Sequence, residues 1–141
     1  MKIYVTGLGV VSGIGIGVSE NIEALRQRKH GIGKITLFPT ALDVPVSEVK
    51  RSNEELKKLI SLPPQRTVSR TALLGMIAAE EAMKDAGLTP PLRIGFISAT
   101  SVGGMDLSEH FYESFKKNPG QGRLREVISH DCGASTELIA S

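Results

Sequence analysis

One short segment of the 141-residue chain holds side chains that could carry out covalent chemistry. It contains the single cysteine, Cys132, two residues after His130 and three before Ser135. A cysteine near a histidine and at the start of a helix can become a nucleophilic thiolate. Residues two apart in sequence rarely face each other, however, and a catalytic base usually comes from another part of the fold. We therefore interpret Cys132 as a small side chain at a packed turn, and we expect no catalytic residue in this chain.

A glycine-rich stretch near the N-terminus suggests a second kind of site. Gly7-x-Gly9-x-x-Ser12 follows a predicted strand and is close to the Gly-x-Gly-x-x-Gly pattern, which places a pyrophosphate at a helix N-terminus. Ser12 replaces the third glycine, glycines continue to Gly17, and the acidic residue expected about 20 positions later is absent. Dinucleotide binding is therefore the weaker alternative to a glycine-rich turn packed beneath other elements.

The remaining chemistry is excluded by spacing and composition. His110, His130, Asp131 and Cys132 do not have the spacing of a metal-ligand set, so we predict no metal site. The chain has 17 Lys and Arg against 15 Asp and Glu, and this balance argues against a nucleic-acid partner. It lacks an apolar run long enough to span a membrane, and its single cysteine favours a reducing, cytoplasmic compartment.

The apolar and turn patterns predict strands alternating with helices. The expected strands are 3–6 and 93–99, with a loop region and a short strand in 32–51. The longest expected helix, 67–86, has small residues on much of its surface, which predicts burial on more than one side. A helix over 20–29 is expected to be capped by Ser19 and to end at Gly31. Capping boxes predict helices over 53–60 and 106–117. A helical turn is expected at 124–128, and a last helix over 136–141 is expected to be capped by Ser135. The last helix carries no stop signal, so we expect the chain to be cut within it.

Taken together, these elements resemble the start of a β-ketoacyl-acyl-carrier-protein synthase, a condensing enzyme of the thiolase-like family. Four segments carry the resemblance in the same order and spacing: Val5–Ser12, Ala82–Leu88, Arg93–Gly95 and Ser101–Met105. The resemblance implies an α/β, thiolase-like fold, present as an incomplete N-terminal half with a mixed sheet and packed helices. Residues 1–141 would form one partial domain that stops before the family nucleophile.

The resemblance also implies a reaction. Enzymes of this family carry out decarboxylative Claisen condensation of acyl and malonyl thioesters in fatty-acid or polyketide synthesis. The substrates are carried on the phosphopantetheine of acyl carrier protein, with no further cofactor, and the enzymes pair as homodimers or heterodimers. The family nucleophile lies in a Thr-Ala-Cys context that Cys132 does not share, so we expect this chain alone to be inactive. A non-catalytic subunit similar to a chain-length factor is the alternative.

The resemblance assigns two sets of binding residues. Val102 corresponds to the residue that gates the acyl pocket, and Gly103 and Gly104 would let the loop approach the acyl chain. Four arginines fall near the face that docks the carrier protein, where their guanidinium groups would bind phosphate and acidic side chains. They are Arg66, Arg70, Arg123 and Arg125. We further expect the isolated chain to leave apolar faces open and to associate.

Overall fold

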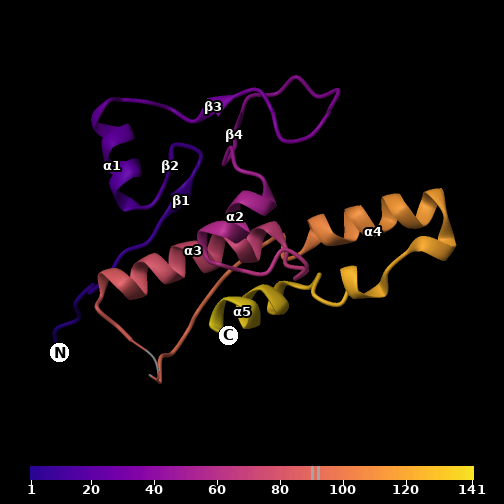
Figure 1. Ribbon diagram of the computed structural model, residues 1–141. Helices are drawn as coiled ribbons and strands as arrows, with labels where there is room; N and C mark the ends of the chain where they lie inside the picture. Colours follow the sequence, from indigo (N-terminus) through magenta and orange to yellow (C-terminus); the bar gives the residue numbers. More distant parts are fainter. Residues whose placement is uncertain (90, 92) are drawn as a thin grey trace.

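The computed structural model describes residues 1–89, 91 and 93–141 (Figure 1). The α-helices of this part are α1 Val18–Arg26, α2 Asn53–Leu59, α3 Arg70–Asp85, α4 Met105–Lys117 and α5 Cys132–Ala140. The strands are β1 Val11–Ser12, β2 Gly15–Ile16, β3 Ile32–Gly33 and β4 Val46–Ser47, and two 3₁₀ turns follow α4, η1 Pro119–Gln121 and η2 Leu124–Glu126. None of the described helices is long and apolar enough to cross a membrane.

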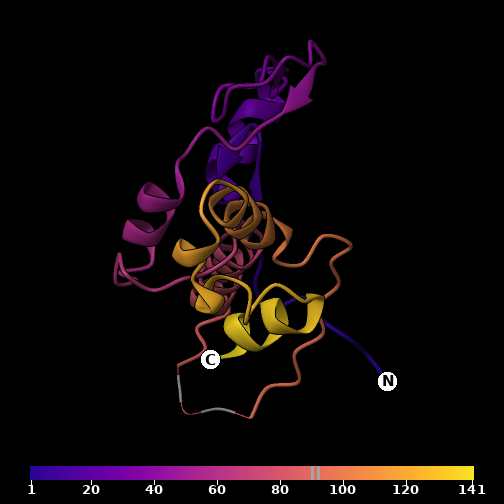
Figure 2. The ribbon, with the colours of Figure 1, turned by 90° about the vertical axis from the view of Figure 1, so that its right-hand side faces the viewer.

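Helix α3 lies at the centre of the molecule, with α2 and α5 packed against it (Figures 1 and 2). The buried core is formed by apolar residues of α2, α3 and the segment before α3: Leu56, Val68, Ala72, Leu73 and Ile77. On another side of α3, the absence of a side chain at Gly75 makes room for Ile139 of α5. The predicted burial of this helix on more than one side is therefore confirmed. It begins at Arg70, three residues later than expected, because the Ser69 hydroxyl accepts a hydrogen bond from the Ala72 N–H (3.2 Å).

The glycine-rich segment packs on the C-terminal half of α3, as the sequence indicated. A Cβ on Gly7 would overlap the carbonyl oxygen of Ala82, and one on Gly9 would overlap that of Ala78. Carboxylates of α3 then accept backbone N–H groups from this segment. Glu81 accepts from Val10 (3.0 Å) and Val18 (2.7 Å), and Asp85 accepts from Leu8 (2.9 Å). The glycines are required because backbone meets backbone here.

The strand predictions are only partly correct. Residues 3–6 and 93–99 form no ladder, and they are exposed, with Ile3 at 83% and Ile97 at 97%. Their apolar composition suits strands, but a strand exists only where a second strand accepts its backbone hydrogen bonds. The ladders of the described residues, β1–β2 and β3–β4, are both antiparallel hairpins rather than the mixed sheet expected. The β3–β4 pair confirms the short strand predicted within 32–51.

Helix α1 differs from its prediction at both ends. It begins after Gly17, whose φ of 93° is in the left-handed region, so Ser19 lies inside the helix and caps nothing. It ends at Arg26, with Gln27 as the C-cap, rather than near Gly31, because Arg28 itself adopts φ 53°. The large apolar side chains of this helix, Ile22 and Leu25, are exposed. The buried positions are instead Asn21 and Ala24, since the Asn21 amide donates to the carbonyl oxygens of Gly15 and Gly17 in the preceding hairpin.

Helices α2 and α5 begin with side-chain caps. The predicted box at Ser52 is confirmed: its hydroxyl accepts from the Glu55 N–H (3.2 Å), and the Glu55 carboxylate accepts from the Ser52 N–H (2.8 Å). In α5 the cap is Asp131, which accepts from the Ala134 N–H (2.8 Å), whereas Ser135 lies inside the helix and is buried. Asp131 precedes Ser135 by about one turn, so the helix starts earlier than predicted.

Candidate acyl-pocket loop and carrier-docking site

The loop between residue 99 and α4 contains the three predicted pocket residues and is held by hydrogen bonds that its backbone N–H groups donate. The Thr100 hydroxyl accepts from the N–H groups of Val102 (3.2 Å) and Gly103 (3.1 Å). The Gly104 N–H donates to the carbonyl oxygen of His130 (2.9 Å), which ties the loop to the segment before α5. The loop is therefore fixed at several points before α4 begins, as a binding loop needs to be.

Gly103 and Gly104 face protein backbone in this structure. A Cβ on Gly103 would lie 2.9 Å from the Cys132 nitrogen, and one on Gly104 would lie 2.8 Å from the His130 Cα. Gly103 also has a φ of 58°, a conformation that glycine adopts without strain. Val102 is 51% exposed and lines neither of the two cavities described below. The glycines thus allow residues 129–132 to approach the loop, and Val102 is the member of the set whose side chain is free to meet a ligand.

Asp106 connects this loop to the central helix. Its carboxylate accepts a hydrogen bond from the backbone N–H of Arg70 (2.8 Å), the first residue of α3. The capping box predicted at 106–109 is therefore wrong, because the Asp106 carboxylate satisfies the N-terminus of α3 and the N-cap position of α4 is Gly104. A negative charge at that end of α3 also suits the helix dipole. The predicted end of α4 at Lys117 is confirmed.

The structure separates the four candidate arginines. The Arg70 guanidinium donates to the carbonyl oxygens of Arg51 (2.9 Å) and Val49 (2.7 Å) and to the side-chain oxygen of Asn53 (2.8 Å). Arg70 therefore secures the segment that leads into α2. Arg125 is exposed on η2, and it does not line the cavity that Arg66 and Arg123 share.

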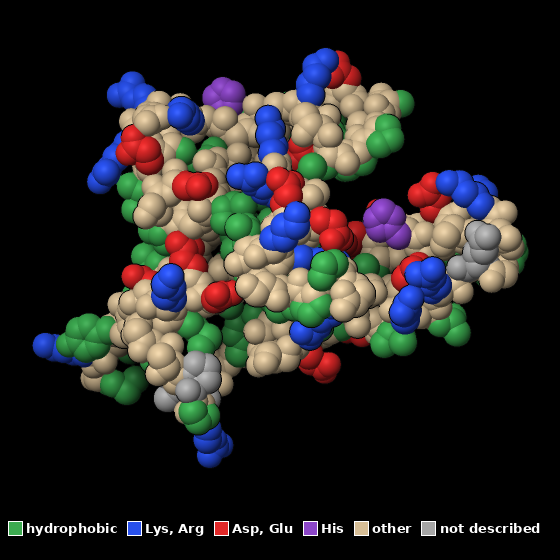
Figure 3. Space-filling view, in the orientation of Figure 1, with side chains coloured by type: hydrophobic (Ala, Val, Ile, Leu, Met, Phe, Trp, Pro, Cys, Tyr) green, Lys and Arg blue, Asp and Glu red, His purple; other side chains and the backbone are tan. Residues whose placement is uncertain are grey.

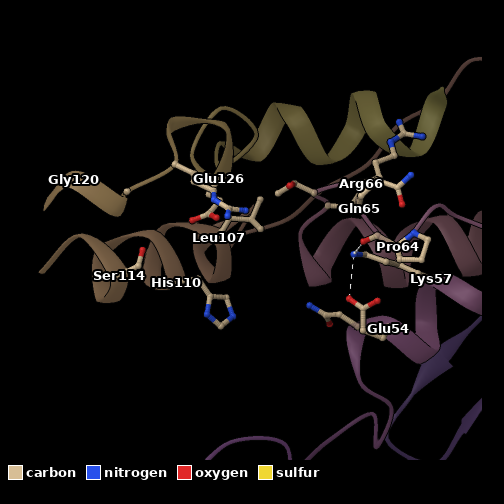
Figure 4. A pocket seen from close by; sticks show the side chains of 15 residues that line it. Glu54, Lys57, Pro64, Gln65, Arg66, Leu107, His110, Ser114, Gly120 and Glu126 are labelled. Atoms are coloured by element: carbon tan, nitrogen blue, oxygen red, sulfur yellow. Dashed lines mark hydrogen bonds and ion pairs between the residues drawn. The ribbon is translucent and has the colours of Figure 1, made fainter. Parts of the chain in front are cut away.

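Arg66 and Arg123 both line an open cavity of about 1000 Å³. The cavity lies between α2 and residues 64–68 on one side and α4 with the η1–η2 segment on the other (Figure 4). Its charged and titratable lining residues are Glu54, Lys57, Arg66, His110, Arg123 and Glu126. The Lys57 ammonium is engaged, since it donates to the Pro64 carbonyl oxygen (2.7 Å) and pairs with Glu54 (3.3 Å), as Figure 4 shows.

The sequence and fold of this chain match those of characterised proteins. The profile of the family described as "Beta-ketoacyl synthase, N-terminal domain" matches residues 1–140. The chain belongs to this family. A solved structure of "the ishigamide ketosynthase/chain length factor" superposes with a TM-score of 0.78 and 28% identity over 96% of this chain and 35% of that one. The thiolase-like α/β fold class is confirmed by this likeness.

Two curated relatives are similar to most of this chain. One is 3-oxoacyl-[acyl-carrier-protein] synthase 2 of Coxiella burnetii, 31% identical over 80% of this chain and 28% of the relative. The other is nodulation protein E of Rhizobium meliloti, 28% identical over 84% of this chain and 30% of the relative. The chain thus spans about a third of the length of these relatives.

In this ketoacyl synthase domain, the His130–Cys132 segment does not form a nucleophile–base pair. Cys132 is exposed at the first turn of α5, which corrects the expectation of a packed side chain. The His130 Nδ1 hydrogen-bonds to the carbonyl oxygen of Val127. No hydrogen bond joins His130 to Cys132 among the described residues. Neither do the described residues hold a cluster of three or more metal-ligating side chains.

The glycine-rich segment does not offer a phosphate site. In a dinucleotide-binding turn, free backbone N–H groups at the helix N-terminus bind the pyrophosphate. Here Glu81 accepts the N–H groups of Val10 and Val18, and Glu20 accepts that of Ile16 (2.8 Å). Two carboxylates at this position would repel a phosphate. The dinucleotide alternative is therefore not supported.

A smaller cavity, of about 360 Å³, was not foreseen from the sequence. It lies between Gly9, α3, α5 and residues 96–100, and small residues of α3 form its floor. Ser135 lines it and is 2% exposed, yet its hydroxyl has no hydrogen-bond partner among the described residues. In the sequence, Ser135 has the pattern of a helix cap, and that pattern does not indicate that its side chain is buried beside a cavity.

Proposed function

We propose that this chain is the N-terminal part of a β-ketoacyl-acyl-carrier-protein synthase that condenses acyl and malonyl thioesters. The observation that carries the proposal is the family match over residues 1–140. The arginine-lined cavity supports it, because it offers a place for an anionic carrier. The exposed Val102 side chain on the fixed loop before α4 is the one that we assign to the acyl chain. The single cysteine fits the cytoplasmic setting that we propose for the protein.

The chemistry requires a nucleophile that we place outside these 141 residues. In the condensation, a cysteine thiolate attacks an acyl-carrier thioester and releases the carrier thiol. A malonyl thioester then loses carbon dioxide, and the resulting carbanion attacks the acyl-enzyme, which releases the thiolate. Hydrogen-bond donors stabilise the oxyanion formed in each attack. Cys132 lacks a base in its segment, so the chain alone is inactive in this proposal.

The loop of residues 102–104 contributes to acyl specificity. Val102 presents a small apolar side chain that is half exposed, on a loop tied to Thr100, His130 and, through Asp106, to α3. A fixed loop with a small side chain can define the end of an apolar pocket, since a larger residue there would fill it. Gly103 and Gly104 set the path of this loop.

The carrier protein docks at the cavity between α2 and α4. Arg66 and Arg123 line it from two different segments, and a guanidinium group binds phosphate through two parallel hydrogen bonds. Arg70 is engaged by the 49–53 segment and therefore supports the site without contacting the carrier. Arg125 lies on the adjacent surface and adds positive charge there.

A non-catalytic subunit similar to a chain-length factor is the second candidate. The solved relative with a TM-score of 0.78 is named as a ketosynthase/chain length factor, and both kinds of subunit fit the matched part of the fold. The two candidates differ at the family's nucleophile position, where a synthase has cysteine. Sequencing the coding DNA beyond the codon for Ser141 separates them if it encodes that position.

Binding of a fluorescently labelled phosphopantetheine-bearing carrier protein tests the proposal. We expect fluorescence anisotropy to show saturable binding that weakens with salt. The double variant R66E/R123E should weaken it about tenfold or more, because two attractive contacts become repulsive. The control is Arg26→Glu, which changes an exposed arginine on α1. Equal binding by the double variant and the control would refute the docking site.

A further inference from the structure

Lys57 of α2 is a lysine that the fold buries. It is 8% exposed, whereas Lys58, the next residue of the same helix, is exposed. A buried ammonium group costs free energy unless protein acceptors replace the water that it loses. Here the acceptors are the Pro64 carbonyl oxygen, at 2.7 Å, and the Glu54 carboxylate, at 3.3 Å (Figure 4). The Lys57 ammonium is therefore already bound within the protein, although the residue lines the larger cavity.

The carbonyl oxygen that Lys57 binds belongs to the tight turn that leads to Arg66. The Arg66 N–H donates to the Pro63 carbonyl oxygen (3.0 Å), which closes a four-residue turn over residues 63–66. Pro64 occupies the second position of this turn, where its fixed φ is favourable. The turn's own hydrogen bond does not use the Pro64 carbonyl. The bond from Lys57 therefore attaches the middle of the 63–66 turn to α2.

The 63–66 turn depends on this attachment because its own residues are exposed. On one side of it, the Leu62 N–H donates to the Lys57 carbonyl oxygen (2.9 Å). On the other side, Val68 is buried in the core at 3% exposure. Between these two points the turn has few buried contacts, and such segments open most easily. Loss of the Lys57 ammonium should therefore leave the turn, and Arg66 with it, free to move.

The place of Arg66 matters because positive charge is not concentrated on this molecule. The net charge is +2, and Figure 3 shows Lys and Arg side chains interspersed with Asp and Glu on one face. In the larger cavity, Arg66 and Arg123 are accompanied by the carboxylates Glu54 and Glu126. An anionic group entering there meets charges of both signs. Its attraction therefore depends on where each guanidinium group is held, since a guanidinium–phosphate pair needs a close and specific geometry.

We propose that Lys57 is a positioning residue for carrier docking, which holds Arg66 in place through the Pro64 carbonyl oxygen. Lys57 does not contact the carrier, because two acceptors already hold its ammonium group. Arg66 makes the contact with the carrier. This inference rests on the proposed function, since it assigns Lys57 a role in the same docking site.

A double-mutant cycle tests this role, with the anisotropy of the labelled phosphopantetheine-bearing carrier protein as its readout. Lys57→Met should weaken carrier binding about fivefold, and the double variant K57M/R66M should bind no more weakly than R66M alone, because Lys57 acts through Arg66. The matched control Lys58→Met removes the same charge from the neighbouring exposed position and should weaken binding by less than about twofold. Fully additive effects of K57M and R66M would overturn the proposal, because Lys57 would then contact the carrier independently.

The same titrations separate this inference from the proposed function. Absence of carrier binding to the wild-type chain would overturn the proposed function itself. Wild-type binding together with equal affinities of K57M and K58M would overturn only the role of Lys57. Circular dichroism of each variant in the helical region shows whether it keeps the wild-type fold.

Amine labelling of the wild-type chain provides a second measurement that does not depend on a variant folding. With acetic anhydride as the probe and tandem mass spectrometry as the readout, Lys57 should be acetylated about tenfold or more slowly than Lys58. This difference should be the same with and without the carrier protein. Acetylation of both lysines at one rate would overturn the proposal. Protection of Lys57 that appears only with the carrier would also overturn it, because the ammonium would then be held by the carrier and not by Pro64.

Discussion

Replacing Gly9 with alanine should destabilise the chain strongly, whereas the same change at Gly33 should not. A Cβ on Gly9 would overlap the carbonyl oxygen of Ala78 and lie 2.9 Å from the nitrogen of Ala82. Both atoms belong to the backbone of α3, which cannot move aside as a side chain can. At Gly33, a Cβ would meet nothing within 4 Å.

The two substitutions should therefore differ in their effect on the free energy of unfolding. Overpacking costs about 1–3 kcal/mol and more where backbone must shift, so we expect Gly9→Ala to lower the free energy of unfolding by about 3 kcal/mol. Alanine also restricts the unfolded chain, which stabilises a protein by about 0.4–1 kcal/mol where the native conformation accepts it. Gly33→Ala should therefore be neutral or stabilising by up to about 1 kcal/mol. A loss of about 3 kcal/mol is a large part of the roughly 5–15 kcal/mol that stabilises a typical domain.

Urea unfolding, followed by circular dichroism in the helical region, measures both changes. The urea midpoint of the Gly9 variant should fall well below that of the wild type, with a similar slope against urea. The midpoint of the Gly33 variant should be equal or higher. Equal midpoints for the two variants would refute the inference that Gly9 is needed because the backbone of the glycine-rich segment contacts the backbone of α3.

Three further predictions concern other contacts. Glu81→Ala leaves the backbone N–H groups of Val10 and Val18 without their acceptor. It should lower the free energy of unfolding, measured in urea, by about 2–3 kcal/mol. The control Glu80→Ala, at an exposed position of α3, should change that free energy by less than about 0.5 kcal/mol. The hydrogen bond from the Thr36 hydroxyl and the backbone bonds beside it hold the pKa of Glu48 below its ordinary 4.5. The stabilisation from these hydrogen bonds is therefore present above pH 4.5 and is lost as the pH falls through the lowered pKa of Glu48. The amide resonances of residues 36–37 should shift with this titration, and Glu48→Gln should abolish the shift. Val102→Phe, made in the longer synthase, should shift the product profile toward shorter acyl chains; an unchanged profile from a folded enzyme would contradict the acyl-pocket role.

Local sequence signals predicted the helices well where a side chain alone decides the boundary. The capping box at Ser52 and the glycine after α3 are such signals, since Gly87 adopts the left-handed φ of 66° that follows a helix end. Long-range contacts overruled the signal elsewhere. Asp106 was expected to cap its own helix, but its carboxylate is used by α3, 36 residues earlier in the chain.

The strands and the site were harder to predict, for a related reason. The composition of 93–99 suits a strand, yet pairing depends on a second strand whose presence composition does not reveal. The family resemblance assigns four arginines to carrier docking, and of these only Arg66 and Arg123 share a cavity. Arg70 has the same residue type but bonds to the 49–53 segment, a contact that no local pattern encodes.

We propose that this ketoacyl synthase domain receives an acyl carrier but does not itself supply the nucleophile. Intact-mass spectrometry after incubation with an acyl-carrier thioester tests this most directly. We expect the mass of the chain to stay unchanged under conditions in which anisotropy shows the carrier bound. An added acyl mass that disappears in the Cys132→Ser variant would contradict it, because Cys132 would then be an acyl acceptor within these 141 residues.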